Sequence, residues 1–184
     1  MSLLDMVQQH LGPGEIEQIS RQIGAEPTQT RRAVDAAVPM LVGGMASTAQ
    51  QPAGMGFLQQ ALGSHAGVLD DLGSLLGAGA PADGGGLLGR VLGQHQTTAE
   101  QGVQQASGLN SDQTRRLLMI LAPIVIGMLA RRHAQATQPG QQANPDLGNV
   151  LQQEARDAHA QAQRQSPHVG GLLGKILSHV ETPR

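Results

Sequence analysis

The chain has 184 residues, a formal net charge of −2, one phenylalanine, and no cysteine, tryptophan or tyrosine. Its length allows one hydrophobic core of ordinary size, and the absence of cysteine excludes disulfides, thiolate metal ligands and a thiol nucleophile. The small negative charge excludes a general electrostatic attraction to nucleic acid or anionic lipid, although eleven of the twelve basic residues are arginine. Because aromatic and β-branched residues are few and leucine and alanine are common, the composition favours an all-α fold.

The first half of the chain predicts three helices, at about Leu3 to Leu11, Glu15 to Ile23 and Pro27 to Ala46. Pro27 suits the first position of the third helix, and Gln29 is placed to reach back to its start, as in a capping box. A connecting region follows. It contains a helical stretch at about residues 57–76 and the segment GAGAPADGGG, whose composition is typical of a flexible linker.

The second half predicts three further helices, at about Leu87 to Gln94, Ala99 to Ser107 and Ser111 to Arg132. Asn110 or Ser111 suits the N-cap of the last of these, and Gln113 is placed to reach back to it. We therefore expect one helical domain over residues 1–132.

The two halves resemble each other when the sequence is shifted by 84 residues without a gap. QTRRAVDAAVPMLVGGMA begins at Gln29, and QTRRLLMILAPIVIGMLA begins at Gln113. Between Gly24 and Ala46, eight of 23 positions are identical to their counterparts. The pattern predicts an internal duplication, with repeat one at about residues 3–46 and repeat two at about residues 87–132.

Each long helix carries a proline within its apolar run, Pro39 in the first and Pro123 in the second. Proline removes one helical hydrogen bond and its ring clashes with the carbonyl four residues earlier, so we expect both helices to be kinked. An apolar run of fourteen residues, Leu117 to Ala130, is shorter than the roughly 20 residues of a membrane-spanning helix. We therefore expect the long helices to form one buried core that contains Val34, Val38, Leu41, Val42, Leu118, Leu121, Val125 and Leu129.

Beyond the second repeat, residues 133–169 are expected to form a polar linker that contains an exposed helix at about residues 146–165. The segment 170–184 then predicts a short amphipathic helix whose pattern, GGLLGKIL, is close to GGLLGRVL at residues 85–92. A lone helix of this length does not hold its shape in water, so we expect it to dock either on its own core or, the alternative that we favour, on a neighbouring molecule. The predicted contact residues are Leu172, Leu173, Ile176, Leu177 and Val180.

Two arginine pairs lie near the starts of the long helices, Arg31 with Arg32 and Arg115 with Arg116. Together with unpaired backbone amides they could contact an anion. The favoured alternative is that their stems lie along the core and their guanidinium groups lie in water.

The stretch from Ile16 to Ala37 has the pattern of a helix-turn-helix, in which Thr28, Gln29 and Arg32 would face base edges. Because the net charge is negative and the second helix continues into an apolar run, we retain a DNA-associated regulator only as an alternative. A membrane-surface protein is a further alternative.

The sequence offers no set of residues for catalysis. The seven histidines are scattered and carboxylates are sparse, so we expect no metal, no cofactor and no enzymatic activity. GGGLLG at Gly84 to Gly89 fits a dinucleotide-binding fingerprint formally, but no strand precedes it. The N-terminal residues lack the pattern of a secretory signal, so we expect a cytoplasmic protein.

The QTRR start, the apolar run with its central proline, and the LLGRVLG segment together resemble the YidB-like family of bacterial proteins. The resemblance covers roughly residues 3–132. It implies a multihelical, duplicated fold without an established activity, and it brings no catalytic or binding residue. The sequence therefore favours a non-enzymatic helical interaction or scaffold protein whose partner is another protein or a second copy of the chain.

Overall fold

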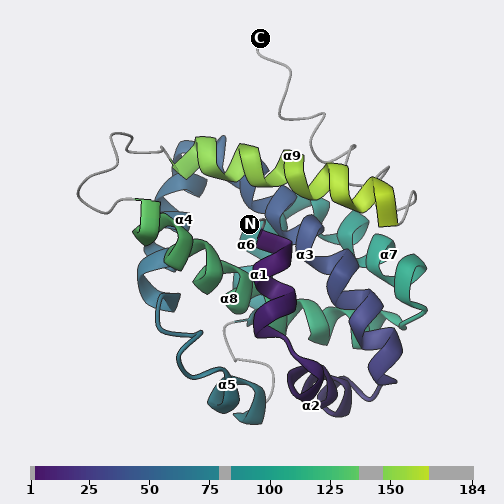
Figure 1. Ribbon diagram of the computed structural model, residues 1–184. Helices are drawn as coiled ribbons and strands as arrows, with labels where there is room; N and C mark the ends of the chain where they lie inside the picture. The colour runs from purple at the N-terminus through teal and green to yellow at the C-terminus, as the bar shows by residue number, and fades with distance from the viewer. Residues whose placement is uncertain (1–2, 79–83, 137–146, 166–184) are drawn as a thin grey trace.

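The computed structural model describes residues 3–78, 84–136 and 147–165, and within these ranges it contains helices and no strand (Figure 1). The predicted all-α fold is therefore confirmed for the described part of the chain. The helices of the first half are α1 (Leu3–His10), α2 (Pro13–Ile23), α3 (Pro27–Ala49), α4 (Pro52–His65) and α5 (Leu72–Ala78). Those of the second half are α6 (Gly84–Leu92), the 3₁₀ turn η1 (Gly93–His95), α7 (Gln96–Ser107), α8 (Ser111–Ala136) and α9 (Leu147–Gln165).

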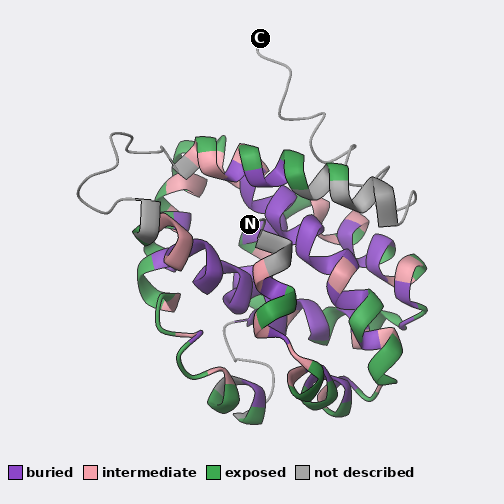
Figure 2. Ribbon diagram, viewed as in Figure 1, coloured by how far each residue is buried: buried purple, intermediate pink, exposed green. Residues whose placement is uncertain are grey.

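The two long helices, α3 and α8, lie at the centre of the molecule. They pack against each other; α3 also packs against α6, α7 and α9, and α8 against α4 and α6. Figure 2 shows buried residues along these central helices and exposed residues on the outer sides of α2, α5 and α9. The predicted core is confirmed, because all eight of its members are buried in one cluster: Val34, Val38, Leu41, Val42, Leu118, Leu121, Val125 and Leu129.

Both long helices continue through their internal prolines. Pro39 lies inside α3 and Pro123 lies inside α8. Proline cannot donate its backbone nitrogen, so each helix lacks one internal hydrogen bond at this point. The kink expected at these residues stays a prediction.

α8 is long enough to meet a length criterion for a membrane span. Among the described residues, the stretch Ser111–Ala134 has a window of mean hydropathy 1.5, of which 72% is buried inside the protein. The apolar run is shorter than the whole helix. The length of the run is therefore a weaker argument against a membrane span than the sequence suggested. Its burial among the other helices is what is expected of a core helix.

The connecting region contains two helices where one helical stretch was expected. α4 ends at His65, and the turn before α5 is closed by hydrogen bonds from the backbone N–H of Val68 to the carbonyl of His65 and from that of Asp70 to the carbonyl of Gly67. Leucines recur on both sides of this turn, which explains why the pattern suggested one continuous helix.

The C-terminal part of the described chain also differs from the expectation. α8 extends to Ala136, and α9 is not exposed all round, because Leu151, Glu154 and Ala155 are buried. α9 packs along α3 and also contacts α1. This contact was not predicted because the composition of α9 is polar and only one narrow face of the helix is covered.

α3 and α6 cross closely at Gly44. A Cβ atom on Gly44 would lie 2.6 Å from Leu92 Cδ2 and 3.0 Å from the carbonyl oxygen of Val91. Next to the crossing, Thr48 Oγ1 donates a hydrogen bond to the same carbonyl (3.0 Å), and the guanidinium of Arg90 lies 5.2 Å from the ring centre of Phe57. This crossing fixes α6, whose Leu88 and Val91 are fully buried, against the centre of the fold.

Candidate functional site

The start of each long helix lies next to the end of a helix in the opposite half. Gln113 Nε2, in the first turn of α8, donates a hydrogen bond to the carbonyl oxygen of Gly24, which follows α2 (2.6 Å). In the other direction, the amide nitrogen of Gln29 lies 3.7 Å from the position that a Cβ atom on Gly108 would occupy. Gly24 and Gly108 both have positive φ, 68° and 77°, which glycine adopts without strain.

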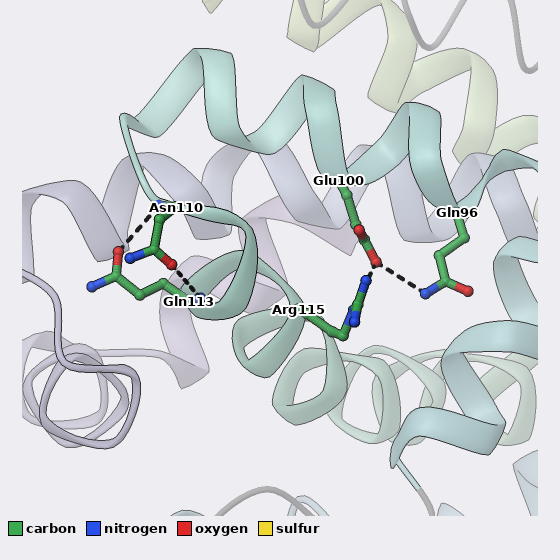
Figure 3. Close-up of polar contacts among 5 residues, drawn as sticks. All are labelled: Gln96, Glu100, Asn110, Gln113 and Arg115. Atoms are coloured by element: carbon green, nitrogen blue, oxygen red, sulfur yellow. Dashed lines mark hydrogen bonds and ion pairs between the residues drawn. The ribbon is translucent and has the colours of Figure 1, made fainter.

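The start of α8 has the predicted capping box (Figure 3). The backbone N–H of Gln113 donates to Asn110 Oδ1 (2.9 Å), and the backbone N–H of Asn110 donates to Gln113 Oε1 (3.1 Å). The corresponding prediction for Gln29 is wrong. The N-cap of α3 is Glu26, which makes no side-chain capping hydrogen bond, and Pro27 leaves one donor fewer to satisfy.

Replacing Asn110 by alanine should lower the free energy of unfolding by about 1 kcal/mol, within a range of about 0.5–2 kcal/mol for a lost N-cap. Urea unfolding followed by circular dichroism measures this change. The matched control is Ser111→Ala, one residue further and also exposed, which should change stability by less than about 0.5 kcal/mol. Equal effects of the two substitutions would contradict the assigned cap.

All four predicted anion-contact arginines, Arg31, Arg32, Arg115 and Arg116, are exposed. Arg115 forms an ion pair with Glu100, from Nε to Oε1 at 3.4 Å, and Gln96 Nε2 donates to the same carboxylate oxygen (2.9 Å; Figure 3). Glu100 itself is buried, with 8% of its surface exposed. Arg115 therefore neutralises the negative charge of a carboxylate that α7 places in the protein interior.

Arg31 lies near a second partly buried carboxylate, that of Asp35 in α3. Burial raises the pKa of Asp35, and the hydrogen bond from Gln8 and the charge of Arg31 partly oppose this shift. Gln8 belongs to α1, and its Nε2 atom lies 3.5 Å from Asp35 Oδ1. Asp35 thus marks the contact between α1 and α3.

The helix-turn-helix pattern corresponds to α2, the turn at residues 24–26, and α3. A shallow hollow of about 460 Å³ lies at this corner, lined by Glu17, Ser20, Arg21, Gly24, Ala25, Glu26, Pro27 and Gln29. Thr28 and Arg32 are exposed and Gln29 is half-buried. The hollow has two acidic residues and one basic residue, and α3 is buried from Ala36 to Ala46, so only its first turns face solvent.

The arginines at the end of α8 join neighbouring elements. Arg131 pairs with Asp70 in the turn after α4, and Arg132 pairs with Glu154 of α9. Glu154 is only 2% exposed. Sequence reasoning missed this contact, although the i, i+3, i+4 spacing of Leu151, Glu154 and Ala155 was a signal for one covered face.

The described residues contain no group of three or more histidine, aspartate or glutamate side chains that could hold a metal ion. The predicted contact residues of the C-terminal helix, Leu172, Leu173, Ile176, Leu177 and Val180, lie outside the described residues. The interactions described above therefore connect helices to one another, through caps, ion pairs and close crossings.

More than half of the chain matches a known protein family. This family, described as a bacterial protein of unknown function (DUF937), matches residues 5–132. No curated protein and no solved structure matches the chain. The matched region begins in α1 and ends within α8, so α9 lies outside it.

Proposed function

The chain belongs to this bacterial family, and on that premise we propose that it is a non-enzymatic helical interaction protein that associates with itself through residues 170–184, here named the C-terminal segment. The observation that carries the proposal is the burial of α6. The C-terminal segment repeats the α6 pattern, with GGLLGKIL at residues 170–177 and GGLLGRVL at residues 85–92.

α6 indicates what such a pattern needs. Leu87, Leu88, Val91 and Leu92 are each 8% exposed or less, and they are covered by α3 and α8. Leu172, Leu173, Ile176 and Leu177 occupy the same positions of the pattern, so their apolar face requires a comparable surface. A surface on a second copy of the chain supplies one without a different partner protein.

We also infer that the two halves derive from one duplicated unit and that the chain is of the YidB-like type. At an offset of 84 residues, Gly24 and Gly108 both end a helix with positive φ, and Pro39 and Pro123 both lie inside a long helix. The helix that follows each long helix supports the same inference. α4 follows α3 and packs on α8, and α9 follows α8 and packs on α3. A chain without cysteine fits a reducing compartment, and the location that we propose is the cytoplasm.

Deleting residues 170–184 should lower the assembled mass, because the segment that joins one copy to the next is lost. Light scattering over a range of protein concentrations measures this mass for the full chain and for the truncated chain. The matched control removes only residues 181–184 and keeps the apolar positions, so it should assemble like the full chain. A full chain that is monomeric at high concentration, or a mass that truncation leaves unchanged, would contradict the proposal.

A further inference from the structure

α3, against which α9 packs together with α6, α7 and α8, is apolar along its middle. Every residue from Ala36 to Ala46 is buried, and these residues are alanine, valine, proline, methionine, leucine and glycine. α9 lies across this helix at the edge of the molecule (Figure 1). If α9 moves away, apolar surface of α3 becomes exposed to water, so another cover is required.

α9 is a poor match for an apolar wall. Among its described side chains, Leu151, Glu154 and Ala155 are buried and Val150 and Gln152 are half-buried, while Asn149, Gln153, Arg156, Asp157 and Ala160 are exposed. One of the three buried residues is a carboxylate, which is held by Arg132 of α8. An ion pair with a buried carboxylate fixes the position of a helix but contributes little net stability, because the carboxylate loses its hydration.

Release of α9 is therefore less costly than release of α6. Among the described residues of α9, Leu151 is the one large apolar side chain that is buried, whereas α6 buries four large apolar side chains. The C-terminal segment follows α9 after only four residues and carries five apolar positions at helical spacing. The fold already accepts its pattern against α3, because α6 packs there.

We propose that the α3 face beneath α9 is the docking surface for Gly170 to Val180 of a second copy of the chain, and that α9 is its displaceable cover. This inference rests on the proposed self-association and names the surface that receives the C-terminal segment. The released α9 and C-terminal segment of the receiving molecule then reach a third copy, so the contact is head to tail and propagates.

Weakening the α9 contact should strengthen self-association. When a binding surface is open only in a minor population, the apparent affinity is reduced by that fraction. Leu151→Ala removes the largest described apolar contact of α9 and increases the open fraction. We expect its association, followed by light scattering, to occur at a protein concentration at least tenfold lower than that of the wild type.

The matched control is Gln153→Ala, which changes an exposed position of the same helix and should leave association unchanged. A second variant, expected to have the opposite effect, distinguishes release of α9 from general unfolding caused by Leu151→Ala. Gln152 is half-buried, so Gln152→Leu should hold α9 more tightly and shift association to a concentration at least tenfold higher.

The outcomes separate the two proposals. If truncation of residues 170–184 abolishes assembly but Leu151→Ala and Gln152→Leu leave it unchanged, self-association stands and the α3 docking surface is wrong. If truncation has no effect, the proposed self-association itself fails. Opposite shifts by the two α9 variants, both lost in the truncated chain, would support the docking surface.

Discussion

Replacing Leu121 by alanine should lower the free energy of unfolding by about 2–5 kcal/mol, the range observed when a buried leucine is truncated. Leu121 is fully buried in α8, at the centre of the cluster that α8 shares with α3. The substitution loses the transfer free energy of the removed carbons and leaves a cavity that the long helices cannot close. Urea unfolding followed by circular dichroism gives the change in the transition midpoint.

The control for this prediction is Arg116→Ala, an exposed position five residues earlier in the same helix. Its effect should stay within about 0.5 kcal/mol, because it removes no buried contact. A loss of similar size at both positions would mean that helix propensity, and not core packing, governs the stability of α8.

Replacing Gly44 by leucine should destabilise the protein by about 1–3 kcal/mol, as overpacking of a closed core does. The Cβ atom alone would lie 3.0 Å from the backbone carbonyl of Val91, and the rest of the side chain has no free space at the crossing of α3 and α6. The substitution forces the two helices apart and also disturbs the hydrogen bond between Thr48 and Val91. Thermal and urea unfolding measure the loss.

Gly63 provides the matched control for Gly44. It lies in α4, is exposed, and has no atom within 4 Å of the position that a Cβ atom would occupy. Gly63→Ala should therefore stabilise the protein by about 0.4–1 kcal/mol, because alanine restricts the unfolded chain and favours helix. If Gly44→Leu were tolerated as well as Gly63→Ala, the close crossing of α3 and α6 would be refuted.

The long helices and their core could be predicted because their apolar runs are dense and are repeated. Every predicted core position is buried, and the capping signal at Asn110 and Gln113 works as expected. The same glutamine in the first half, Gln29, does not cap its helix. The reason is local: Glu26 stands where the second half has Asn110, and Pro27 occupies the first helical position.

The covered face of α9 could not be predicted because its cause is not local. Glu154 is buried because Arg132, 22 residues earlier in the chain, supplies the opposite charge. The apolar surface against which α9 packs belongs to α3, more than 100 residues earlier in the chain. The pair between Glu100 and Arg115 is similar, since each residue taken alone is typical of solvent-exposed helix. Periodicity shows which face of a helix is apolar, but it does not identify the helix that covers it.

The separation in sequence between α3 and the helices that cover it also affects folding during synthesis. α3 ends at Ala49, whereas α7, α8 and α9 begin at Gln96, Ser111 and Leu147. At a synthesis rate of about 5–20 residues per second, roughly 5–20 s pass between completion of α3 and the start of α9. During that interval α6, α7 and α8 are synthesised, but the part of α3 that α9 covers has no final cover on the growing chain. The fold can therefore be completed only late in synthesis or after release, and the nascent first half is the stage at which chaperone binding and aggregation compete with folding.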